Sequence, residues 1–109
     1  MLNWYPKLYV SDAVRSRKNR IISQLDEGKP VTGCVLITFA SAAGDMLDIV
    51  PAQYLSQEAV YSRLPQVVGI ARDRGDAMEQ IRIMTEESLR VTGSADLRQF
   101  LTRRKAGQI

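Results

Sequence analysis

The segment that most constrains the fold is residues 31–40, in which apolar and mixed positions alternate. Alternation with a period of two predicts a β-strand with one apolar face. Residues 41–45 have the length of a hairpin turn, and residues 46–50 form a second short strand pattern that Pro51 ends. The sequence therefore predicts an antiparallel hairpin. The apolar face is Val31, Val35, Ile37 and Phe39, and the mixed face is Thr32, Cys34, Leu36, Thr38 and Ala40.

An amphipathic helix is expected before this hairpin. Ser11 or Asp12 can cap its start, and Gly28 followed by Pro30 ends it. Its apolar positions recur at helical spacing on one face and are Val14, Ile21, Ile22 and Leu25.

Further elements are expected after the hairpin. Residues 52–64 have the pattern of a short, irregular helix ended by Pro65, and residues 66–71 that of a buried strand. A long helix is predicted over residues 76–92, with Gly93 at its C′ position, and Ser94 is expected to cap a last short helix. The expected inner face of the long helix is Ala77, Met78, Ile81, Met84, Thr85, Ser88 and Val91.

The fold class predicted by this succession is α+β. With residues 7–10 as a first strand, the order matches a ferredoxin-like βαββαβ arrangement, a two-layer sandwich with an extra C-terminal helix. The alternative is a three-stranded sheet with helices on one face. A chain of 109 residues supports one cooperative core, so we expect one domain over residues 1–102 and a flexible basic tail over residues 103–109.

Composition narrows the functional classes. The chain has no histidine and one cysteine, Cys34, which removes most zinc, redox-relay and histidine-dependent hydrolase mechanisms. No cofactor or metal site is expected, and an enzyme is the least expected class. The lone cysteine and the absence of an export signal or a membrane-spanning stretch favour the cytoplasm, without membrane association.

Three short segments carry a resemblance to a known group. They are residues 8–11 (LYVS) before the first helix, residues 68–71 (VGIA) before the long helix, and Gly93 with residues 96–98 (DLR) near the end. Their layout resembles small proteins of Gram-positive anaerobic bacteria to which no activity is assigned. The resemblance covers residues 8–101 and implies a bacterial, cytoplasmic protein. It implies no catalytic or binding residue.

A first candidate site is the turn that leads into the long helix. Free amides at a helix N-terminus, together with Arg72 and Arg74, could hold a small anion, and Gly75 would let the backbone approach it. The alternative is ordinary capping, because Asp73 and Asp76 can bind the same amides.

A second candidate site is a nucleic-acid surface. Residues 1–29 carry a net charge of +3, residues 30–102 carry −3, and residues 103–109 carry +3. Binding to nucleic acid would require the two basic ends to meet on one face of the fold. The residues concerned are Arg15, Arg17, Lys18, Arg20, Arg103, Arg104 and Lys105. The alternative is that these side chains form a solvated rim.

Aromatic and sulfur-containing side chains suggest a third site. Trp4, Tyr5 and Tyr9 either pack back onto the domain or anchor a second subunit. Met46, Met78 and Met84 either fill the core or form an adaptable binding surface. The leading hypothesis is a small non-enzymatic protein that acts through protein contact as a homo-oligomer.

Two smaller features are expected to be structural. Asp45 and Asp48 could hold Mg²⁺ or act as an acid/base pair, but protection of a sheet edge is the simpler interpretation of both. Cys34 is expected to be a small core residue and not a nucleophile.

Overall fold

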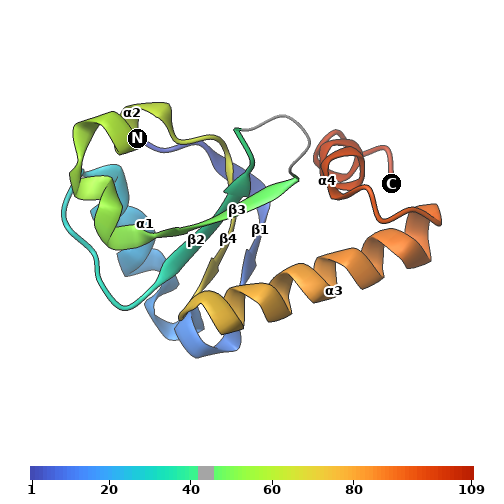
Figure 1. The fold of residues 1–109 in the computed structure, drawn as a ribbon, viewed down its shortest axis with the longest axis horizontal. Helices are drawn as coiled ribbons and strands as arrows, with labels where there is room; N and C mark the ends of the chain where they lie inside the picture. The colour runs from blue at the N-terminus through green and yellow to red at the C-terminus, as the bar shows by residue number, and fades with distance from the viewer. Residues whose placement is uncertain (42–45) are drawn as a thin grey trace.

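A computed structural model describes residues 1–41 and 46–109. Its centre is a four-stranded mixed sheet with the strand order β1-β4-β2-β3 (Figure 1). β1 runs parallel to β4, whereas β4 with β2 and β2 with β3 are antiparallel. The strands are β1 (Trp4–Val10), β2 (Val35–Phe39), β3 (Leu47–Pro51) and β4 (Val67–Ala71).

Helices lie on both faces of this sheet (Figure 1). One face carries two 3₁₀ helices and two α-helices: η1 (Asp12–Arg17), α1 (Lys18–Asp26), η2 (Ala52–Ser56) and α2 (Glu58–Arg63). The other face carries α3 (Arg74–Thr92) and α4 (Leu97–Lys105). Among the described residues, no helix is long and apolar enough to cross a membrane.

The α+β class and the central hairpin are confirmed, since β2 and β3 pair antiparallel from Val35 with Pro51 to Phe39 with Leu47. The three-stranded alternative is wrong because Trp4–Val10 pairs with β4 as a fourth strand. The ferredoxin-like order is not confirmed. In that order the first strand lies between two others, whereas here β1 is an edge strand and β4 occupies the interior. The helices are also divided between the two faces and not collected on one.

The two inner strands are buried because both of their faces meet helices. Along β2, Leu36 packs in the core beneath α1, while Val35, Ile37 and Phe39 pack beneath α3 and α4. The predicted apolar face is therefore correct for these three residues but not for Val31, which precedes β2 and packs in the other core with Leu36. The mixed face is buried from Cys34 onward, whereas Thr32 is exposed. A continuous apolar run such as β4 is typical of a strand covered on both sides.

The helix predictions are confirmed in outline and corrected at their ends. The first helix is capped by Ser11, as expected, but begins as 3₁₀. The segment 52–64 is split where Gln57 adopts an extended conformation. Asp96, and not Ser94, caps α4, whose last turn contains residues 103–105. Met78 and Val91, expected to face inward on α3, are exposed because the core contacts of α3 run through Ala77, Ile81, Met84 and Ser88.

Candidate functional site

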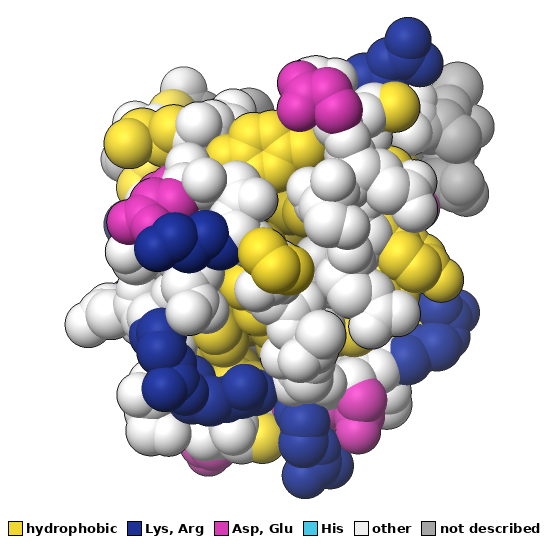
Figure 2. Space-filling view, turned by 90° about the vertical axis from the view of Figure 1, so that its left-hand side faces the viewer, with side chains coloured by type: hydrophobic (Ala, Val, Ile, Leu, Met, Phe, Trp, Pro, Cys, Tyr) yellow, Lys and Arg dark blue, Asp and Glu magenta, His cyan; other side chains and the backbone are white. Residues whose placement is uncertain are grey.

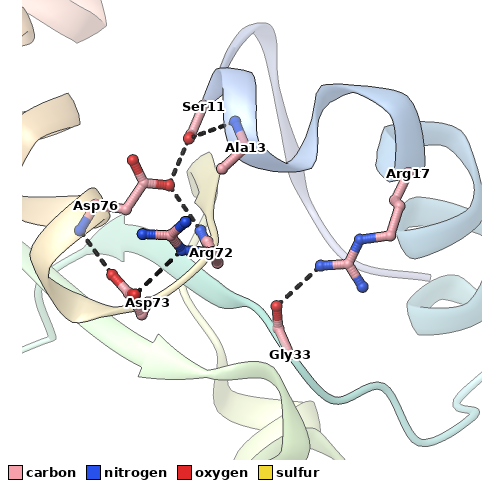
Figure 3. Close-up of polar contacts among 7 residues, drawn as sticks. All are labelled: Ser11, Ala13, Arg17, Gly33, Arg72, Asp73 and Asp76. Carbon is pink, nitrogen blue, oxygen red and sulfur yellow. Dashed lines mark hydrogen bonds and ion pairs between the residues drawn. The ribbon is translucent and has the colours of Figure 1, made fainter.

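The turn before α3, the candidate anion site, is filled by its own carboxylates (Figure 3). Asp73 caps the helix, since its Oδ1 accepts the Asp76 N–H at 2.9 Å. Asp76 Oδ2 accepts the Arg72 N–H at 2.9 Å and also the hydroxyl of Ser11. This carboxylate therefore links the turn to the start of η1.

The arginines of this turn do not converge. The Arg72 guanidinium pairs with Asp73 at 3.2 Å, and Arg74 lines a groove beside β3 instead. A side chain at Gly75 would meet only Asp73 Oδ1 at 3.6 Å, so no close backbone approach requires glycine there. Carboxylates engage the Arg72 and Asp76 amides and the Arg72 guanidinium, and anion binding at this turn stays an untested prediction.

The seven basic residues of the candidate nucleic-acid surface are only partly brought together. Arg15 and Arg104 line one shared hollow, although they come from opposite ends of the sequence. Arg17 donates to the Gly33 carbonyl at 2.9 Å (Figure 3), Lys105 donates to Gln66, and Arg103 lines a different hollow.

The described side chains on the face that carries α1 and α2 also form no continuous basic stripe (Figure 2). Figure 2 shows its Lys and Arg side chains in separate groups around the margin, with apolar side chains between them. This arrangement resembles a solvated rim more than a track of phosphate contacts.

The N-terminal aromatic residues pack back onto the domain. Trp4 Nε1 donates to Asp26 at 2.8 Å, and Tyr5, only 1% exposed, donates its hydroxyl to the Leu101 carbonyl at 2.8 Å. Tyr9 donates to Glu87 at 2.9 Å. Burial raises the pKa of both tyrosines. These side chains fasten β1 to α1, α3 and α4.

A groove of about 600 Å³ lies between edge strand β3 and α3. Met46 and Met78 line it and are 41% and 51% exposed, whereas Met84 is fully buried. Met84 therefore fills the core, whereas Met46 and Met78 lie at the surface. Leu47, Ile49 and Ile81 form the apolar floor of the groove.

The outer edge of β3 presents free backbone groups. The Ala40 N–H donates to the Met46 carbonyl and the Ala52 N–H donates to the Cys34 carbonyl. These bonds show which opposite residue pairs of the β2–β3 ladder are hydrogen-bonded and which are not. Since bonded and non-bonded pairs alternate in an antiparallel ladder, Leu47 and Ile49 direct their N–H and C=O groups away from β2. No strand covers this edge within the described residues.

The comparisons with known proteins add nothing to this geometry. No family model, curated protein or solved structure matches this chain.

The remaining candidates are Asp45, Asp48 and Cys34. Asp45 lies outside the described residues, and Asp48 lies in β3 opposite Thr38. No group of three potential metal ligands occurs in residues 1–41 and 46–109. Cys34 is buried, and burial raises the pKa of its thiol, although the charge of Arg17 lowers it by a smaller amount.

The β3–α3 groove is not predicted from the sequence. Its signal is two methionines, one at each border of the groove, but their exposure depends on the packing of β3 against α3. The combination of a free strand edge with an apolar groove beside it is a typical site for a second strand.

Proposed function

We propose that the protein functions through protein contact as a homodimer in which two copies of β3 pair antiparallel. The observation that carries this proposal is the free β3 edge beside an apolar groove. A twofold dimer uses the same patch on both subunits, so the patch must be complementary to itself.

The hydrogen-bonding pattern of β3 meets this requirement. With the twofold axis at Ile49, the Ile49 N–H of each copy donates to the Ile49 carbonyl of the other. The next bonds join the Leu47 N–H to the Pro51 carbonyl. In this pair Pro51 accepts but, having no N–H, cannot donate to the Leu47 carbonyl, so the pair has one hydrogen bond and not two. Every outward N–H between Leu47 and Pro51 therefore finds an acceptor, and the Leu47 carbonyl is the one outward group without a donor.

Charged side chains lie near both ends of the groove. Arg74 borders it toward the Pro51 end of β3, because Val35 pairs with both Pro51 and Ala71, the last residue of β4. Asp96 lies at the other end, since it caps α4 and the next residue, Leu97, contacts Met46. A twofold rotation exchanges the two ends and brings each Arg74 toward the Asp96 of the partner.

The opposite edge of the sheet is less suited to pairing. Pro6 and Lys7 are exposed on β1, and proline and lysine on an edge strand discourage the addition of another strand. The proposed dimer needs no disulfide, which fits a single buried cysteine and a reducing compartment such as the cytoplasm.

The test is light scattering on the purified protein over a range of micromolar concentrations, with two matched variants. Met78→Glu places a charge in the groove. Leu89→Glu is the control, because Leu89 lies on the same helix, is 48% exposed and does not line the groove. We expect the parent and Leu89→Glu to be dimers and Met78→Glu to dissociate at least about tenfold more readily.

Three outcomes contradict the proposal. The parent chain is monomeric at all concentrations, the two variants weaken the dimer equally, or neither variant changes it. If the protein is monomeric but binds an added β-strand peptide in the groove, the β3 edge binds another partner and not a second copy of this chain.

A further inference from the structure

A second hollow, at the β1 edge of the sheet, gathers basic side chains from three elements. It has a volume of about 300 Å³ and lies at the opposite edge of the sheet from β3. Lys7 comes from β1, Arg90 from α3 and Arg104 from α4. Glu87 is the one carboxylate side chain among the described residues that line it.

Glu87 does not neutralise Lys7 or Arg90, because both of its interactions are with other residues. It accepts from Tyr9 at 2.9 Å and pairs with Arg104 at 2.6 Å. Within the described part of the chain, Lys7 and Arg90 have no carboxylate partner. Two positive charges therefore remain for a ligand.

Arg104 is held in place before any ligand arrives. Its guanidinium lies 5.6 Å from the centre of the Tyr9 ring and 5.9 Å from that of Phe100. Only its Nη1 makes hydrogen bonds to the described residues, which leaves the donors on Nε and Nη2 without a protein acceptor there. A fixed guanidinium with free donors is well suited to bind a carboxylate or phosphate.

The rest of the lining is apolar. Val91 is 52% exposed although it is β-branched and apolar, and Ile109 and the Phe100 ring lie in the same hollow. An inorganic ion would leave these side chains uncovered. A ligand with an acidic group and a small apolar body would use both parts of the lining.

We propose that this hollow binds a small organic oxyanion, with its acidic group on Lys7, Arg90 and Arg104 and its apolar part against Val91. The acidic group is a carboxylate or a phosphate, which bind the same donors. This site is separate from the Arg72–Gly75 turn and from the proposed dimer edge.

The test is a titration with benzoate, phenyl phosphate and inorganic phosphate, at constant ionic strength maintained with chloride and followed by backbone amide NMR shifts. We expect saturable shifts around the hollow with benzoate or phenyl phosphate, and the stronger of the two identifies the acidic group. Inorganic phosphate should bind more weakly than phenyl phosphate. Binding that is equally tight would overturn the role of the apolar wall.

Matched variants locate the site. Lys7 and Arg90 are exposed, so Lys7→Gln with Arg90→Gln should fold normally and reduce affinity by about tenfold or more, since each removes a charge-assisted contact. Arg103→Gln is the control, because Arg103 is adjacent to Arg104 but lines a different hollow. Equal binding by the double variant would overturn the proposal.

Two further measurements distinguish this site from the dimer edge and from a nucleic-acid surface. Met78→Glu should bind the probe as the parent does, whether or not the dimer forms. A single-stranded oligonucleotide that binds more tightly than phenyl phosphate, and whose binding Arg103→Gln also weakens, would indicate a nucleic-acid surface and contradict the small-molecule assignment.

Discussion

Glu87 of α3 and Arg104 of α4 form a 2.6 Å ion pair whose side chains are only 24% and 33% exposed. In every other ion pair among the described residues, both side chains are more than half exposed. Tyr9 of β1 joins this pair through hydrogen bonds to both partners. The cluster therefore fastens an edge strand and two helices to one another.

Replacing Glu87 should destabilise the fold. Glu87→Gln leaves the Arg104 charge partly buried without its carboxylate, which we expect to lower the free energy of unfolding by about 1–3 kcal/mol. Glu86→Gln is the control, because Glu86 pairs with Arg82 on the exposed face of the same helix and should change little. Urea denaturation followed by circular dichroism measures both. Equal effects would show that the Glu87 ion pair adds no more stability than the exposed Glu86 pair and would contradict this prediction.

Stability should fall at high pH through Tyr9. Burial, followed by the hydrogen bond to Glu87, raises the pKa of this phenol in the folded protein. The folded state therefore holds the proton more tightly than the unfolded chain, and the stabilisation is complete below about pH 10 and lost as pH rises above it. Because burial also raises the pKa of Tyr5, Tyr9→Phe should reduce this loss without abolishing it. Denaturant midpoints at increasing pH give the slope, and an unchanged slope in the variant contradicts the assignment.

Gly69 should be intolerant of a side chain. A Cβ there would lie 3.1 Å from both the Tyr9 carbonyl oxygen and Ile37 Cδ1, in the interior strand between β1 and β2. Gly69→Ala should therefore cost about 1–3 kcal/mol of unfolding free energy, from overpacking. Gly75→Ala is the control. Gly75 lies in α3 and has space for a Cβ, so Gly75→Ala should leave the free energy of unfolding unchanged or raise it by about 0.5–1 kcal/mol. Thermal or urea denaturation compares the two, and a Gly69→Ala protein as stable as the parent would contradict the close packing at this strand.

Asp48 should weaken the proposed dimer. In the register centred on Ile49, the two copies of Asp48 are diagonal neighbours on one face of the joined sheets, where like charges repel. Asp48→Asn should therefore tighten the dimer, by about twofold to fivefold for a few tenths of a kcal/mol up to about 1 kcal/mol. Sedimentation equilibrium measures the constant. A weaker dimer in this variant would contradict the register.

The sequence predicts the local elements well because their signals are local. The alternation through Ile37, the cap at Asp73 and the glycine at position 93 each depend on a few neighbouring residues. Strand order is different, because the insertion of β4 between β1 and β2 depends on how helices on both faces pack. Local patterns do not determine that packing.

The candidate sites show the same division. Capping by Asp73 and Asp76 can be predicted as the alternative to an anion site, since both residues lie within one turn. Arg15 and Arg104 line one hollow, and Met46 and Met78 line another, although each pair is far apart in the sequence, so these arrangements require the tertiary fold. The burial of Tyr5 likewise depends on α4, since its hydroxyl bonds to Leu101 near the other end of the chain.

The most direct test of the proposed dimer is amide hydrogen exchange at Leu47 and Ile49 as a function of protein concentration. Their N–H groups point away from β2, so they exchange rapidly in a monomer and are protected only when a second strand binds. We expect protection at high concentration that is lost on dilution, while the Asp48 and Val50 amides, bonded within the hairpin, stay protected throughout. Rapid exchange of Leu47 and Ile49 in a sample that light scattering shows to be dimeric would contradict the β3 pairing.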